Sequence, residues 1–250
     1  MAIALVKKDP NATIPAEATG VASLGTTFDS NTTSGNLLVA TASTWISGTA
    51  PTMTFSDNKS NDWSVNAISQ LGSGSAIRVA IGYSASVTGG ATHTVTVTPS
   101  ASCDICLGAE EISGAKTSSP ITGTPVGAAG SSTAASSGST TPAGNAIVIG
   151  AAVYTGATTT LVLNWASASQ LHNEPDTTYP TLGSAYIATS GAQTAAWTLG
   201  ASRAWGACVA AFAEAVGGIT QSSVISASAS VPTHTAVILY PGSVIPTITL

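Results

Sequence analysis

The sequence predicts an all-β protein, an antiparallel and jelly-roll-like β-sandwich. Three observations support this fold class. Apolar and polar residues alternate with period two in several short segments, as in strands with one buried face. Thr and Val, which suit a pleated surface, dominate these segments. Clusters of Asn, Asp, Gly and Ser separate them at short spacing, and long helical patterns are missing.

The clearest strand is the segment 92–98, in which Thr lines one face and His93, Val95 and Val97 line the other. Turn residues fill the segments 56–62 and 88–90, as expected between paired strands. Further alternating strands are predicted at residues 52–55, 63–67, 77–81 and 161–165.

An internal repeat organises the chain, because four short matches recur in the same order. The Ala-rich segment 207–215 would suit a helix, but we predict a strand there because it aligns with the Cys106 segment. The matches are 35–40 with 144–149, 81–84 with 184–187, the strand of Val95 and Val97 with that of Trp197 and Leu199, and 106–109 with 208–211.

The repeat gives two half-sets of strands, residues 20–114 and 131–217, joined by a Gly-, Ser-, Thr- and Pro-rich link at 115–130. They could form two small sandwiches in tandem or close one larger sandwich. Aromatic residues make up only 5% of the chain, so two separate cores would be thin. We therefore expect one joint sandwich over residues 20–217.

The two ends of the chain are predicted to make contacts with partners. Residues 1–19 form an N-terminal arm, and residues 218–250 form an extension without Asp, Glu, Lys or Arg. An uncharged, β-prone extension needs a pairing partner, which is the chain's own sheet or a neighbouring subunit. The expected partner contacts are Val237, Ile238, Leu239, Tyr240, Val244, Ile245 and Ile248.

Charge is sparse, because only 7% of the residues are Asp, Glu, Lys or Arg. Proton transfer, metal binding and stabilisation of developing charge need such groups, so we expect no enzyme and no cofactor. The net charge is −5 and no basic cluster exceeds the Lys7-Lys8 pair, which argues against nucleic acid as a partner. Polar residues interrupt every apolar run, so we expect no membrane insertion. The first apolar run is short and its charges follow it, so we expect no secretion signal at the start.

No motif points to a catalytic residue or a metal site. His93, His172 and His234 lie far apart and are expected at the surface or at the edge of the core. Cys103 and Cys106 have the spacing of zinc and redox sites, but on a strand they would face opposite sides and lie buried.

Two acidic segments leave alternatives open. The loop from Asp57 to Asp62 could hold a hard cation such as calcium or form a plain hairpin turn, which we favour. Glu110 and Glu111 are adjacent, and adjacent residues of a strand face opposite ways, so they are not expected to form a catalytic carboxylate pair.

An exposed tryptophan can stack on a sugar ring, so each tryptophan is a candidate glycan contact. Trp63, Trp165 and Trp197 lie on the apolar faces of predicted strands and are expected in the core. Trp45 lies at a strand end and is the candidate for an exposed glycan contact.

A succession of turn and strand motifs runs along the chain: Gly35-Asn36-Leu-Leu-Val, Phe55-Ser-Asp57-Asn58, Asp62-Trp63, the segment 89–97, and Glu110-Glu111-Ile-Ser-Gly114. This succession resembles that of β-sandwich proteins on the virion surface of tailed bacteriophages, such as capsid decoration or cement proteins, head fibres and tail modules. The resemblance covers residues 20–217, not the uncharged extension, and identifies no functional residue.

The resemblance implies a structural virion protein that is assembled in the host cytoplasm and binds the outside of the capsid or tail. Its expected partners are a major capsid or tail protein and further copies of itself. The alternative is a carbohydrate-binding adhesin module that recognises a glycan on the host cell surface.

Overall fold

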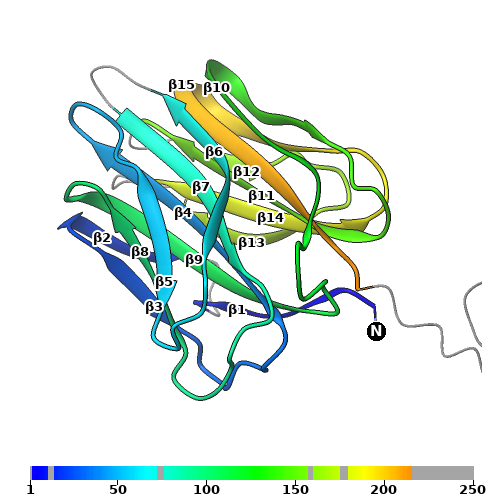
Figure 1. The fold of residues 1–250 in the computed structure, drawn as a ribbon. Coiled ribbons are helices and arrows are strands. Elements are labelled where there is room, and N and C mark those ends of the chain that lie inside the picture. The colour runs from blue at the N-terminus through cyan, green and yellow to red at the C-terminus, as the bar shows by residue number, and fades with distance from the viewer. Residues whose placement is uncertain (1, 11–13, 72–75, 157–159, 175–179, 216–250) are drawn as a thin grey trace, which may run out of the picture. The chain divides into compact units, whose positions relative to one another are not determined.

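The computed structural model describes residues 2–10, 14–71, 76–156, 160–174 and 180–215, and the side chains of all of these except 66–71 (Figure 1). The predicted all-β antiparallel sandwich is confirmed, because the described residues form strands and no helix. The strands are β1 (Ala4–Asp9), β2 (Ala16–Val21), β3 (Leu24–Thr27), β4 (Leu37–Ile46), β5 (Met53–Asp57), β6 (Ser64–Leu71), β7 (Ala76–Ser84), β8 (Thr94–Pro99), β9 (Cys103–Ser113), β10 (Ile121–Thr140), β11 (Ala146–Tyr154), β12 (Leu161–Leu163), β13 (Ser169–Glu174), β14 (Leu182–Thr189) and β15 (Gln193–Ala213).

The strands predicted from alternation are all present. The segment 92–98 corresponds to β8, and the Ala-rich segment 207–215 is strand up to Ala213, as the repeat predicted. Among the described residues there is no helix with the length and apolar character that a bilayer crossing requires.

The first half of the chain forms a main sheet and a smaller sheet that covers it. The main sheet has the order β1-β9-β4-β7-β6. Strand β2 also pairs with β9, and it does so along the first half of β9, while β1 pairs with the second half. The covering sheet has the order β3-β8-β5. Phe55, Val95 and Val97 of this sheet pack on Leu107 and Ala109 of β9 to form the first outer core.

The second half also has a main sheet with a covering layer, but the covering layer is formed in a different way. Its main sheet has the order β10-β15-β11-β14-β13. The long strand β15 pairs with β11 through Trp205–Ala213 and with the short strand β12 through Trp197–Leu199. Trp197 and Val209 of this one strand lie in the same second outer core, so β15 folds back over its own sheet. The long hairpin of β10 and β15 thus covers the main sheet of the second half, as the separate sheet β3-β8-β5 covers that of the first half (Figure 1).

A third core lies between the two main sheets and joins the halves. Val39 of β4 and Ile81 of β7 meet Ile149 of β11 and Phe212 of β15 there. Strand β9 packs against β13, since Gly108 lies directly against the ring of His172. At the other edge of the first main sheet, strand β6 lies beside β15 of the second half.

The repeated segments occupy matching places in this arrangement. Cys106 and Cys208 both lie in the central core, and Val97 and Leu199 lie in the two outer cores. The Gly-Asn match is offset by one residue. It aligns Leu37 with Ala146, but Leu37 faces the central core and Ala146 faces the second outer core.

Besides the core that the two main sheets share, each half has an outer core of its own. Few large side chains are enough to fill these cores. Trp165 and Trp197 pack over Ala195 and Gly150, where the missing side-chain bulk lets the layers approach closely.

The predicted arm and link also have a different structure. Both strands of the segment 1–19, β1 and β2, pair with β9, so this segment is an edge of the main sheet and not a free arm. The segment 115–130 overlaps β10, which starts at Ile121 and pairs with β15 over its whole length. Met1–Gly217 forms one compact unit, and the predicted extension 218–250, with its seven expected contact residues, lies outside the described residues.

Candidate functional site

Several of the few carboxylates of this chain lie inside the protein. Asp9, Glu110, Glu111 and Glu174 are buried, and the side chain of Asp57 is fully buried as well. Ionised side chains are ordinarily the most exposed of all, and a buried one must be paired or hydrogen-bonded. The partners of these carboxylates therefore indicate what the charges are used for.

Two adjacent lysines of β1 lie opposite two adjacent glutamates of β9. The antiparallel register pairs Lys7 with Glu111 and Lys8 with Glu110. Because side chains alternate along a strand, one pair lies on each face of the sheet. Lys7 Nζ lies 3.2 Å from Glu111 Oε2, and Glu111 Oε1 also accepts hydrogen bonds from Thr33 N and Asn36 Nδ2 at 2.8 and 2.6 Å.

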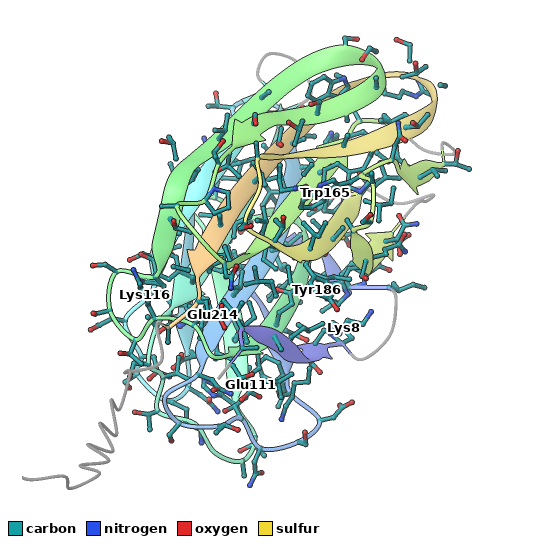
Figure 2. All side chains as sticks on the ribbon, turned by 90° about the vertical axis from the view of Figure 1, so that its right-hand side faces the viewer. Lys8, Glu111, Lys116, Trp165, Tyr186 and Glu214 are labelled. Carbon is teal, nitrogen blue, oxygen red and sulfur yellow. The ribbon has the colours of Figure 1, made fainter. Side chains whose placement is uncertain are left out.

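The other face carries what we call the seam cluster, formed by Lys8, Glu110 and His172. It lies where β1 and β9 of the first half meet β13 of the second half. His172 Nε2 lies 3.5 Å from Glu110 Oε1, and both side chains are fully buried. Lys8 Nζ donates a hydrogen bond to Leu171 O of β13. Figure 2 shows Lys8 on β1, next to the strands of the second half.

Burial dominates the electrostatics of the seam cluster. Burial lowers the pKa of Lys8 below its usual value, and the negative charge of Glu110 partly offsets this effect. The side chain of Asp9 lies on the opposite face of β1 from that of Lys8. Burial raises the pKa of Asp9, and repulsion by Asp29 adds to the rise. A hydrogen bond from Thr26 and the proximity of His172 act in the opposite direction.

A second buried network holds the loops at one end of the first half. Asp57 Oδ1 accepts hydrogen bonds from the backbone N–H groups of Lys59 and Asn61, and Asp57 Oδ2 accepts one from Trp63 Nε1 at 2.8 Å. His93 Nε2 lies 3.3 Å from Asp57 Oδ2. Burial opposes the ionisation of Asp57, but these hydrogen bonds outweigh it, and the pKa of the carboxyl lies below its usual value.

The ring of His93 connects this network to another loop. Its Nδ1 lies 2.7 Å from Thr32 Oγ1, and Thr32 bridges to Gly90 through the backbone. The series Asp57, His93 and Thr32 has the residue types of a nucleophilic triad. His93 is fully buried and Thr32 is 4% exposed, so the hydroxyl is enclosed and acts to tie three loops together.

Comparison with protein-family models, with curated proteins and with solved structures finds no match.

An open hollow of about 410 Å³ lies near the N-terminus and the end of β15. Glu214 is its ionisable lining residue, and Glu214 Oε1 accepts a hydrogen bond from the backbone N–H of Ile3 at 3.3 Å. This carboxylate thus fastens the start of the chain to the end of β15. Its other lining residues are Ala2, Asn145, Ala146, Ala188, Thr189 and Ser190.

The described residues that the sequence analysis singled out pack in the cores or hold a loop. Trp45, the candidate glycan contact, is half-buried and packs against the central core. Cys103 lies in the first outer core and Cys106 in the central core, so the two thiols face opposite sides of β9 as predicted. The Asp57 carboxylate is surrounded by N–H donors, but its loop is not the hairpin turn that we favoured, because it joins β5 of the covering sheet to β6 of the main sheet. His234 lies outside the described residues.

The seam cluster was not found from the sequence. His93 and His172 are fully buried and do not lie at the surface or core edge as expected. One signal was present, namely a Lys-Lys pair in a chain with only 6 basic residues and a Glu-Glu pair on an apolar strand. Placing these pairs face to face required the register of β1 on β9, which no local pattern specifies.

Proposed function

We propose that this chain is a structural virion protein of a tailed bacteriophage, one that binds the outside of the capsid or tail through contacts between protein surfaces. The observation that supports this most is strand β10. It runs from Ile121 to Thr140 at the edge of the second main sheet and carries no charged residue.

An edge strand of this kind suits contact with other protein subunits. Charged residues are depleted in the centre of protein interfaces, because every charge there has to lose its water. Isolated proteins generally protect long edge strands with charges, and β10 lacks them. Gly127, Ala129 and Ser131 are exposed, and their small or absent side chains let a partner approach the strand closely.

The placement of the ionisable groups supports the same proposal. The charges of Glu110, Glu111 and Asp57 are engaged in holding strands and loops, and these side chains are enclosed. We propose that the protein acts by the area it buries and not by a reaction. The extension 218–250 is a further expected contact, and further copies of the chain are expected partners.

The test is whether the chain is part of particles. Virions purified from the source of this sequence are expected to contain the chain in a fixed copy number by quantitative mass spectrometry. An antibody against the chain is expected to label the head or tail exterior in electron micrographs. Absence of the chain from purified virions would refute the proposal.

A matched pair of variants tests the contribution of β10. Ser131→Lys places a charge on the exposed side of β10 and is expected to lower binding to particles that lack the chain by about tenfold or more. Thr98→Lys places the same charge on the exposed face of β8 and is expected to leave binding unchanged. Equal binding by both variants would exclude β10 as the contact.

The alternative, a glycan-binding adhesin, has less support. Its candidate contact, Trp45, packs against the central core, whereas a stacking platform needs an exposed ring face. A glycan array with the full chain distinguishes the two proposals, since the virion proposal requires no sugar ligand.

A further inference from the structure

We propose that Lys7 and Asn36 become joined by an isopeptide bond, and that Glu111 carries the protons for this reaction. An isopeptide bond is an amide between two side chains, here between the Lys7 amine and the Asn36 carboxamide. One buried carboxylate, that of Glu111, has the amine beside one oxygen and the carboxamide on the other. This modification is independent of the proposed virion role.

The three residues come from adjacent strands of the first main sheet. Glu111 lies on β9, and its register partners are Lys7 on β1 and Leu38 on β4. Residues paired in this way share a face of the sheet, and so do side chains two residues apart along a strand. Asn36 comes two residues before Leu38, and its side chain reaches Glu111 on that same face.

The carboxylate holds both reacting groups in place. Glu111 is fully buried, Lys7 Nζ lies 3.2 Å from its Oε2, and Asn36 Nδ2 donates to its Oε1 at 2.6 Å. The loop after β3 closes over the amine, because Lys7 Nζ also donates to Ser30 Oγ at 2.9 Å and to Asn31 O at 2.6 Å. Groups that are held together in this way react as if they were at very high concentration.

One oxygen of the carboxylate is available for proton transfer. Glu111 Oε2 is buried and accepts no hydrogen bond from the part of the chain that the structure describes. The ammonium group of Lys7 is the charge beside it. Passing one proton across this contact gives a neutral amine and a neutral acid, which removes the cost of an enclosed charge.

The reaction needs no further reactant. The neutral amine of Lys7 attacks, and its lone pair forms a bond to Asn36 Cγ. The bond from Cγ to Nδ2 then breaks as Glu111 returns its proton to the leaving nitrogen, which also takes up the second proton that Nζ gives up. Lys–NH₃⁺ and Asn–CONH₂ thus become Lys–NH–CO–Asn and NH₄⁺. The Lys7 side chain is 23% exposed, so the ammonium ion can leave to solvent.

The bond fastens an edge of the sheet. It joins β1, near the start of the chain, to the start of β4. Terminal segments open more easily than the rest of a domain, and a covalent link also restricts the unfolded chain. The linked protein is therefore expected to keep β1 in place where hydrogen bonds alone would let it fray.

Mass spectrometry of the full chain tests the proposal. The denatured wild type is expected to be lighter than its sequence by the mass of ammonia, about 17 Da, and proteolysis should release one peptide that joins Lys7 to Asn36. Separate, unlinked peptides for Lys7 and Asn36 in the wild type would overturn the proposal, whether or not any variant folds. Loss of ammonia without the joined peptide would also overturn it, because a cyclised asparagine loses the same mass.

The adjacent lysine provides a matched control. Lys7→Arg and Glu111→Gln are each expected to abolish the joined peptide, the first by removing the nucleophile and the second by removing the proton carrier. Lys8→Arg is expected to retain it, because Lys8 Nζ lies on the other face of the sheet and donates to Leu171 O. Linkage in Glu111→Gln to the wild-type extent, or its loss in Lys8→Arg, would overturn the assignment of these roles.

Discussion

Asp57 shows at the scale of one residue how the carboxylates of this chain are used. Its two oxygens fix the turn after β5 by accepting hydrogen bonds from Lys59, Asn61 and Trp63, and His93 lies beside them. Asn and Asp at turns commonly bond to the backbone two residues on. Here the same carboxylate also anchors an indole and an imidazole, so it holds both a loop and the edge of the first outer core.

Replacement of this carboxylate is expected to be costly. Asp57→Ala leaves the N–H groups of Lys59 and Asn61 without their acceptor and should destabilise the protein by about 2–4 kcal/mol at neutral pH, measured by urea denaturation. Asp62→Ala, at an exposed position of the same loop, should change stability by less than about 0.5 kcal/mol. An equal loss in both variants would contradict the assigned role.

The pH dependence of this effect has a definite sign. The pKa of Asp57 is lowered in the folded protein, so its stabilisation is present above the unfolded pKa of about 3.9 and is lost as the pH falls through the folded pKa. The difference in stability between the wild type and Asp57→Ala should therefore shrink in acid. A difference that stays constant down to about pH 2 would contradict the ionised state of Asp57.

Gly108 is a second single residue with a specific requirement. A Cβ at this position would collide with the ring of His172, so only glycine lets β9 and β13 come together here. Gly108→Ala should cost about 1–3 kcal/mol in a thermal or urea unfolding experiment. The control is Gly191→Ala at an exposed turn, where the nearest atom to a new Cβ is Thr189 Oγ1 at 3.8 Å. Similar losses at both sites would argue against this close approach.

At the scale of the element, the strands differ in how well the sequence predicts them. Strand β8 was predictable, because alternation of Thr with Val fixes both its type and its buried face. Strand β10 was not, because its Gly, Ser, Thr and Ala composition is also that of a flexible link. What makes β10 a strand is pairing with β15, more than fifty residues away, and no local pattern reports such a partner.

The same distinction applies to the candidate site. The opposite orientation of Glu110 and Glu111 followed from strand geometry alone. Their partners, His172 and Lys7, come from β13 and β1, and only the tertiary register brings them together. Local alternation thus predicted the faces, and long-range pairing decided the contacts.

The strands β9 and β15 carry the three cysteines, and their burial leads to a prediction on reactivity. Burial raises the pKa of Cys103 to about 11 and raises the pKa values of Cys106 and Cys208 as well. The thiolate is the reactive form, so a thiol reagent at about pH 8 should label the native protein only very slowly. All three should react promptly in denaturant. Rapid labelling of the native protein would contradict the buried positions.

At the scale of the whole molecule, the shared central core has a consequence for unfolding. Strands of both halves, β4 and β7 with β11 and β15, contribute to it, and the seam cluster adds contacts between the same halves. Loss of either half would expose the central core of the other. We expect Met1–Gly217 to unfold as one cooperative unit, with equal calorimetric and van't Hoff enthalpies. Two separate transitions would indicate independent sandwiches.

The sparse charges of the whole molecule are placed in a consistent way. Carboxylates are buried where they hold loops and join the halves, and the long edge strand β10 has none. A surface of this kind is suited to being covered by other protein subunits, which is the basis of the proposed virion role.

The most direct test of that role is a high-resolution cryo-electron microscopy map of purified virions from the source of this sequence. We expect density for both halves of the chain on the outside of the head or tail, with β10 in contact with a neighbouring subunit. A map without this chain, or one in which β10 faces only solvent, would contradict it.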